Sequence, residues 1–240
     1  MQNFLSSSSA RNLKRARRRA AWVVGLVSIS CAGFAREAPK IQPVSQITAH
    51  GPTLSSASAR VRDIAWANGD RDFLMIDKAF GLILLFKNGE PIFIRPALTG
   101  ANPADRFPSD ALTKSDAETK DLRYKVTPAG RFTVTHGYDE IFGETLNINE
   151  IQGLDWDLAI HRVARGNHAQ YREIRLRPDI SADRHISDGC INVAVDTMAA
   201  LLTFLPNAQK VPIYILPSRD ESIPDFFPAR RQATPSPHRS

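Results

Sequence analysis

Short apolar runs separated by turn-forming residues dominate the sequence between about residues 69 and 217. Runs of about four to eight apolar residues are typical of strands, whereas a helix needs about ten or more residues with a repeat of about 3.6. The dipeptide Asn88-Gly89 separates two of these runs and accepts the positive φ angles of a tight hairpin. The expected strands are residues 73–76, 81–86, 91–98, 130–135, 146–151, 158–163 and 211–216.

One helix is expected in the same segment. Asp196 can cap the N-terminus of residues 197–205, whose apolar side chains fall on one helical face before Pro206. Residues 101–125 are polar and predict a long surface loop, for which we expect the role of a lid. The pattern therefore predicts a mainly β fold in one domain of roughly 150 residues, a size at which folding buries about 70% of the surface of the chain.

Residues 1–35 have the features of an export signal that is cleaved before Arg36. A basic block at residues 11–19 precedes an apolar run that ends in Gly-Phe-Ala at residues 33–35, and signal peptidases read small residues at such positions. The alternatives are a retained membrane anchor, although a spanning helix needs about 20 apolar residues, twin-arginine export, and lipidation of Cys31. Cleavage predicts a chain exported to the periplasm or cell envelope, with no membrane span after cleavage.

The segments on either side of the domain lack apolar periodicity. Residues 36–68 are rich in Ser, Ala, Pro and Thr and predict a flexible linker, and residues 218–240 predict a disordered tail in which Phe226-Phe227 packs locally. The net charge of +6 comes from six basic residues in the N-terminal basic block, because acidic and basic residues balance in the rest of the chain. The charge therefore does not favour a nucleic-acid partner.

Cys190 would be the single cysteine of the mature chain, because Cys31 leaves with the signal. A lone thiol in an oxidising compartment is a liability unless it is buried or used for chemistry. Gly189 lets a substrate carbonyl approach the backbone, whose N–H groups can hold a developing oxyanion. These features favour a thiol nucleophile over the alternative, a small buried apolar residue.

A thiol nucleophile needs a base, and three histidines are candidates. His161 ends an alternating apolar run, so a rigid strand would present it. His168 lies in a polar stretch whose mobility would spoil the alignment, and His185 is close to Cys190 along the chain. His161 is therefore the expected base, and the other two are second choices. A metal site is a weaker alternative, because pairs with zinc-like spacing are missing; its ligands would be His161, His185, Asp188 and Cys190.

The stretch from Ser187 to Asn192, Ser-Asp-Gly-Cys-Ile-Asn, resembles the nucleophile motif of the L,D-transpeptidase (YkuD) catalytic domain family. That motif is Ser/Thr-His-Gly-Cys, then an apolar residue, then Asn or Arg, so five of six positions agree. Other features occur in the family's order within about residues 72–217: Leu98-Thr99-Gly100, Thr127-Pro128-Ala129-Gly130-Arg131-Phe132 and Ile160-His161.

Two departures from the family pattern concern the candidate site. Asp188 stands where the motif has His, and a carboxylate beside Cys190 would oppose thiolate formation unless it points away. His161 lies 29 positions before Cys190, a wider gap than is usual in the family. An insertion within the polar residues 165–183 would explain this gap, whereas His168 would restore a more usual spacing without the strand.

The resemblance implies a β-sandwich of the L,D-transpeptidase type over residues 69–217, with one helix after the catalytic Cys loop. It implies an enzyme that acts on peptidoglycan stem peptides through a thioester on Cys190, with His161 as the base. Backbone N–H groups around Gly189 and Cys190, with Asp188, would hold the oxyanion. Ser187 belongs to the motif, and Asn192 and Arg131 are expected to contact substrate. The family needs no metal or organic cofactor, and carbapenem-type inhibitors are expected to acylate the thiol.

The sequence leaves the reaction outcome open. The acceptor of the acyl group would be an amine of a second stem, giving a 3→3 cross-link, or water, giving an L,D-carboxypeptidase. Hydrolysis or amidation of another envelope amide fits the same residues. The alternative in another class is a wall-binding or scaffolding protein that keeps the fold without turnover, which Asp188 and the displaced base motivate.

Overall fold

The computed structural model describes residues 54–115, 118–151, 157–164, 170–205 and 210–228 of the 240-residue chain. All of these residues belong to one structural unit of the chain. The expected export signal lies outside the described residues, as do most of the expected linker and most of the expected tail. None of the helices within these ranges is long and apolar enough to cross a membrane.

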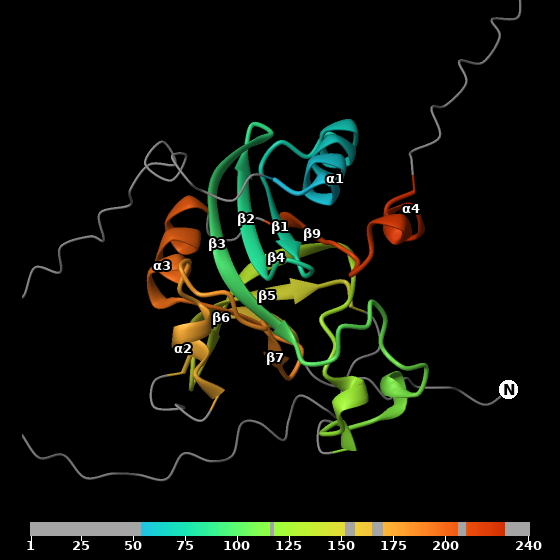
Figure 1. The fold of residues 1–240 in the computed structure, drawn as a ribbon, viewed down its shortest axis with the longest axis vertical. Coiled ribbons are helices and arrows are strands. Elements are labelled where there is room, and N and C mark those ends of the chain that lie inside the picture. Colours follow the sequence, from blue (N-terminus) through green and yellow to red (C-terminus); the bar gives the residue numbers. More distant parts are fainter. Residues whose placement is uncertain (1–53, 116–117, 152–156, 165–169, 206–209, 229–240) are drawn as a thin grey trace, which may run out of the picture. The chain divides into compact units, whose positions relative to one another are not determined.

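The described residues form one sheet of nine strands that closes on itself (Figure 1). Its order is β2-β1-β9-β4-β5-β6-β8-β3-β7, and β2 also pairs with β3, so the first eight strands form a ring. The expected mainly β fold is confirmed, and the two layers expected of a sandwich are opposite sides of one closed sheet. The strands are β1 (Phe73–Asp77), β2 (Leu82–Lys87), β3 (Glu90–Gly100), β4 (Gly130–Asp139), β5 (Gly143–Asn149), β6 (Ala159–Arg162), β7 (His185–Ser187), β8 (Ile191–Val193) and β9 (Val211–Ile215).

The side chains of the strands pack into two apolar clusters, one on each face of the sheet. One face of each strand of the ring contributes to the inner cluster, as Leu74 and Ile76 do on β1. The opposite face of β1 contributes Phe73 and Met75 to an outer cluster, which α1 (Ser56–Ala67) and α4 (Ile223–Phe226) cover. The helix α3 (Val195–Phe204) adds Met198 and Leu201 to the inner cluster. A fourth helix, α2 (Arg172–Arg175), lies between β6 and β7.

The local sequence signals of the hairpin and of α3 are confirmed, with one correction. Asn88 and Gly89 have φ angles of 52° and 78°, as a tight two-residue turn requires. The helix predicted at residues 197–205 is present as α3, but its N-cap is Ala194. Asp196 instead lies in the first turn and accepts a hydrogen bond from the Thr197 N–H.

The predictions of a flexible linker and a disordered tail are wrong for the residues next to the domain. Residues 56–67 form α1, which Ser55 caps by accepting a hydrogen bond from the Ser58 N–H at 3.0 Å. Ala57, Val61 and Ala65 repeat every four residues and are buried, a narrow stripe that the surrounding Ser and Ala residues conceal. In the expected tail, residues 220–222 form a 3₁₀ turn before α4. Phe227 is buried, which confirms the expected local packing there.

Candidate active site

The loop at residues 188–190 carries the candidate nucleophile and joins two strands that flank β3. β7 pairs in parallel with β3 through Gly100 and Ser187, and β8 pairs antiparallel with β3 through Leu98 and Asn192. Figure 1 shows β3 as a long curved strand that extends from its hairpin with β2 down to β7. One strand therefore fixes both ends of the loop that contains Cys190.

The side chain of Ser187 closes the nucleophile loop internally. Its Oγ donates a hydrogen bond to the Cys190 carbonyl at 2.5 Å and accepts one from the Gly189 N–H at 3.1 Å. Gly189 has φ +123°, and an added Cβ would lie 2.9 Å from the Val126 carbonyl oxygen. Glycine is therefore required here for both its backbone angle and its close approach to Val126. The Gly189 N–H is engaged by Ser187, so the remaining N–H groups of the loop are those of Asp188 and Cys190.

Thr127 ties the nucleophile loop to the segment before β4. Its Oγ1 donates to the Gly189 carbonyl at 2.7 Å and accepts from the Gly100 N–H at 2.8 Å. The Thr-Pro-x-Gly-x-Phe segment thus holds the loop by a hydroxyl group, in keeping with a scaffold role.

Lys78 holds the backbone of Thr127 by a hydrogen bond, a role that the sequence did not predict. Its side chain is 1% exposed, and its Nζ donates to Asp105 Oδ1 at 2.6 Å and to the Thr127 carbonyl at 3.0 Å. Burial lowers the pKa of Lys78, and the bond to Asp105 raises it. Lys78 follows β1 directly, so a lysine at the end of a fully buried strand was the available signal. The bond from Lys78 to Asp105 also anchors the polar loop expected at residues 101–125.

His161 is held in one orientation and one tautomer. Its Nδ1 lies 2.9 Å from the Arg162 carbonyl oxygen, which can only accept, so Nδ1 carries the proton. The Nε2 atom is then an acceptor and receives the Nδ2–H of Asn192 at 3.1 Å. The Phe142 ring stacks on the imidazole, with 3.7 Å between ring centroids. His161 is 4% exposed, and this burial lowers its pKa.

The sheet register brings the segment of Cys190 beside the strand that carries His161. β6 and β8 are parallel, with His161 opposite Asn192, and Cys190 stands two residues before Asn192. Cys190 lies in the bend just before β8 and packs partly against the inner cluster. The charges of Arg172 and Asp139 act on the pKa of both the thiol and the imidazole, so the two groups share one neighbourhood. Within the described residues no hydrogen bond joins the Cys190 Sγ to His161, whose Nε2 is occupied by Asn192.

The pKa of the Cys190 thiol is raised, chiefly by burial and further by Asp188 and Asp139. A backbone hydrogen bond from Ala159 and the charge of Arg172 act in the opposite direction. Because the pKa of His161 is lowered, both partners favour their neutral forms at rest. The arrangement suits base-assisted activation of a thiol at the moment of attack, and not a preformed thiolate and imidazolium pair.

Asp188 points out of the site and is neutralised by a cation from the polar loop. Its side chain is 77% exposed, and its Oδ1 lies 2.6 Å from the Lys125 Nζ. The carboxylate that replaces the motif His therefore has a partner, which reduces its repulsion of charge on Cys190.

Asn192 was expected to contact substrate, but the structure places it inside the site. It is 1% exposed, and both ends of its amide are bonded, Nδ2 to His161 and Oδ1 to the Arg172 Nη1 at 2.6 Å. Arg172 belongs to α2, in the segment between β6 and β7 where an insertion was expected. The sequence reading missed Arg172, because nothing local distinguishes it from its basic neighbours.

Arg131 and His185 have hydrogen-bond partners outside the nucleophile loop. Arg131, expected in the substrate cleft, forms two hydrogen bonds to Asp70 and one to the Tyr214 hydroxyl, where β4 meets β9. His185 is bonded to Asp183, and His168 lies outside the described residues. No group of three or more metal-ligating side chains occurs in the part of the chain that the structure describes.

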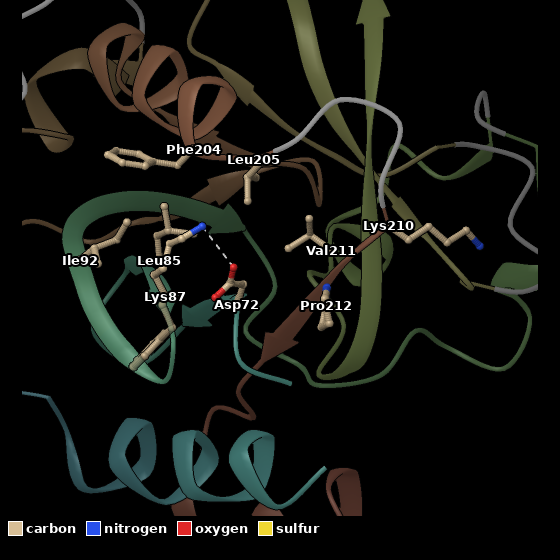
Figure 2. A pocket seen from close by; sticks show the side chains of 10 residues that line it. Asp72, Leu85, Lys87, Ile92, Phe204, Leu205, Lys210, Val211 and Pro212 are labelled. Carbon is tan, nitrogen blue, oxygen red and sulfur yellow. Dashed lines mark ion pairs between the residues drawn. The ribbon is translucent and has the colours of Figure 1, made fainter. Parts of the chain in front are cut away.

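A pocket of about 120 Å³ lies away from these residues, between the ends of β2, β9 and α3 (Figure 2). Figure 2 shows Phe204 and Leu205 on one side and an ion pair between Asp72 and Lys87 on the other. None of the predicted site residues lines it, so the pocket is separate from the candidate chemistry.

The chain is similar to proteins of one known family. The sequence matches the L,D-transpeptidase catalytic domain family, YkuD, over residues 71–213, whereas no curated protein matches it significantly. Similar solved structures include an L,D-transpeptidase from Xylanimonas cellulosilytica DSM 15894, with 15% identity over 61% of each chain and a TM-score of 0.37. Another comes from Mycobacterium tuberculosis H37Rv, with 11% identity over 61% of this chain and 57% of that chain and a TM-score of 0.38.

The catalytic domain from Enterococcus faecium L,D-transpeptidase has 17% identity over 60% of this chain and 96% of that chain, with a TM-score of 0.36. The chain spans about three-fifths of the length of the Xylanimonas and Mycobacterium proteins. The family match covers more than half of the chain and includes both His161 and Cys190. The chain therefore belongs to the YkuD family of L,D-transpeptidase catalytic domains.

Proposed function

We propose that the chain is an exported cysteine L,D-transpeptidase that acts on peptidoglycan stem peptides through a thioester on Cys190. The observation that carries the proposal is the parallel pairing of β6 and β8, which brings the segment of Cys190 beside the strand of His161. The base there has a fixed tautomer, and Ser187 and Thr127 hold the loop of the nucleophile. A fixed nucleophile and a neutral base are what covalent catalysis by a thiol requires.

In the proposed reaction, His161 Nε2 exchanges the amide of Asn192 for the neighbouring thiol when substrate binds. Catalytic hydrogen bonds are often absent before substrate binds, so this exchange is a normal requirement. The thiol proton moves to Nε2 while Sγ attacks the carbonyl carbon of the third residue of a tetrapeptide stem. Collapse of the tetrahedral intermediate breaks the amide bond, and the imidazolium returns the proton to the departing D-Ala amine.

The oxyanion of this intermediate would be held by backbone N–H groups of the loop. Since Ser187 engages the Gly189 N–H, the proposed donors are the N–H groups of Asp188 and Cys190. Loss of one such donor typically slows acyl transfer by about 100-fold to 1,000-fold. The side chain of Asp188 has no part in this step, because it pairs with Lys125.

The thioester is resolved by an amine of a second stem or by water. The amine gives a 3→3 cross-link and water gives an L,D-carboxypeptidase product, and in both cases His161 accepts a proton and the thiol is regenerated. No metal or organic cofactor takes part in these steps. Export follows from the proposed cleavage before Arg36, and the N-terminal sequence of the chain recovered from the bacterial periplasm tests it.

Acylation by a carbapenem tests the proposal. The thiol opens the lactam ring by the same attack and nothing leaves, so the intact mass should rise by one whole inhibitor per chain, with the adduct mapped to Cys190. Cys190→Ala should take up no inhibitor, and His161→Gln should slow uptake by about 100-fold or more.

Muropeptide analysis of cells that express the chain supplies the second measurement. New 3→3 muropeptides, or tripeptide stems, should appear with the native chain and be absent with Cys190→Ala. No adduct together with an unchanged muropeptide profile would reject the enzyme. Binding of that inert protein to isolated sacculi would identify it as a wall-binding scaffold instead.

A further inference from the structure

Arg172 reaches the active-site face from α2 and is fixed there by all three guanidinium nitrogens. Nη1 donates to Asn192 Oδ1 at 2.6 Å, Nη2 to the Ile186 carbonyl at 3.4 Å, and Nε to Gln170 Oε1 at 2.6 Å. Asn192 is buried, so its amide has no water as an alternative partner. The guanidinium therefore dictates which way this amide faces.

The donors and acceptors of this chain allow one arrangement. Arg172 has only donors, so Asn192 must turn its Oδ1 toward the guanidinium and its Nδ2 toward His161. The Arg162 carbonyl fixes the proton of His161 on Nδ1, so Nε2 is free to accept from Nδ2. In the series of hydrogen bonds from Arg172 through Asn192 and His161 to the Arg162 carbonyl, each residue donates to the next one.

Protonation of His161 would break this series. A proton on Nε2 would face the Nδ2–H of Asn192, which places two donors in contact. Rotation of the amide would relieve that contact but would turn the same Nδ2–H toward the guanidinium of Arg172. We infer that Arg172 is a positioning residue that, through the amide of Asn192, holds His161 in the neutral form with Nε2 unprotonated.

Other charged groups near His161 act on its proton as well. Burial lowers the pKa of His161 most, and the charges of Arg172 and Arg162 lower it further, whereas Asp139, the last residue of β4, raises it. Cys190 is neutral at rest, and the more distant Asp188 is paired with Lys125. The charge of Arg172 and its control of the amide act in the same direction, so an experiment must separate them.

The benefit to catalysis of keeping His161 neutral rests on the proposed function. A base that already carries a proton cannot take one from the thiol, so a neutral His161 extends activity toward acidic pH. The same positive charge favours the thiolate of Cys190. Arg172 would thus help both partners, although it contacts neither of them.

The test is a titration of His161 in the full-length chain, followed by NMR of ¹³C-labelled histidine rings. The His161 signal is assigned by its loss in His161→Gln. Arg172→Met should raise the pKa of His161 by about one unit, a tenfold gain in proton affinity. Arg172→Lys keeps a charge and a donor and should restore most of the native value. Arg177→Met, in the same segment, removes a surface arginine that pairs with Asp179 and should leave the titration unchanged.

A double-mutant cycle separates the amide from the charge. In an Asn192→Ala background, Arg172→Met should shift the pKa of His161 by much less than in the native chain. An equal shift in both backgrounds would reduce the role of Arg172 to its charge, and no shift in the native background would remove the role altogether. Either result overturns the inference.

Two controls distinguish an effect on the pKa of His161 from a loss of folding and from a failure of the proposed function. Far-ultraviolet circular dichroism checks that each variant is folded. If Arg172→Met does not fold, Asn192→Asp decides instead, because it offers an acceptor to both neighbours and should raise the pKa of His161, whereas an unchanged pKa overturns the inference. The titration requires no substrate, so the predicted shifts without carbapenem uptake would reject the proposed function alone.

Discussion

Replacement of Thr127 by valine would remove two buried hydrogen bonds and keep the shape of the side chain. Thr127 is 1% exposed, and its hydroxyl serves the Gly100 N–H and the Gly189 carbonyl. A buried polar group that loses its partner costs about 1–3 kcal/mol, so two such groups predict a loss of about 3 kcal/mol in the free energy of unfolding. For a domain of this size the melting temperature should fall by about 6–12 °C.

The second expected effect is local to the nucleophile. Without the hydroxyl, the Gly189 carbonyl must find another donor, and the loop that carries Cys190 will shift. We expect carbapenem acylation, measured by intact mass against time, to slow about tenfold or more, since small misplacements of a nucleophile have effects of this size.

Thr127→Ser is the matched control for both effects. Serine keeps the two hydrogen bonds and loses one methyl group, which costs about 1 kcal/mol. Unfolding in urea should therefore rank native, serine and valine variants in that order of stability. A valine variant as stable as the serine variant, with acylation at the native rate, would refute the view that this hydroxyl holds the loop.

Three further predictions concern the same region. Gly189→Ala forces a Cβ into a backbone of φ +123° and against Val126, so it should cost about 1–3 kcal/mol and abolish carbapenem uptake, and uptake at the native rate would contradict this. The raised pKa of Cys190 means that the folded chain binds the thiol proton more tightly than a free thiol does. The rate of alkylation of Cys190 by iodoacetamide should therefore be lower than that of glutathione at pH 7, and this rate should still increase with pH above pH 9. A rate that is already constant at acidic pH would contradict this. Lys78→Met leaves the Asp105 carboxylate without its cation and should lower the free energy of unfolding in urea by about 3–5 kcal/mol, with partial recovery when Asp105→Asn is added, whereas native stability of the single variant would exclude a structural role for the pair.

Much of the fold was predictable because its signals are local. The Asn88-Gly89 turn, the short apolar runs and the helical face of α3 each depend on neighbours along the chain. The sequence also predicts that His161 and Cys190 belong to one site, through motifs in a fixed order. The structure adds the parallel pairing of β6 and β8, which brings the segment of Cys190 beside the strand of His161.

The parts that could not be predicted depend on contacts between distant segments. Lys78 is buried because closure of the sheet brings the loop of Asp105 over the end of β1, and no local pattern reports that contact. Lys125 and Asp188 are likewise distant in sequence, so the neutralisation of the carboxylate required the fold. Arg172 lies in the segment where an insertion was expected, and composition indicated only a polar stretch there.

Helix α1 illustrates a different limit. Its buried apolar positions are two alanines and one valine, so the apolar stripe is too weak to stand out from a linker composition. The helix is stabilised by the cluster that it covers on β1 and β2, and not by its own propensity. Arg131 was expected to contact substrate because it lies in a family motif, and the structure shows it paired with Asp70.

The position of β3 links the reactivity of the thiol to the integrity of the barrel. This strand closes the ring against β2 and, further along, borders both strands that enter and leave the nucleophile loop. Fraying of β3 would displace the loop of the thiol and would also open the closed sheet between β2 and β3. Loss of thiol chemistry should consequently coincide with opening of the sheet when this molecule unfolds.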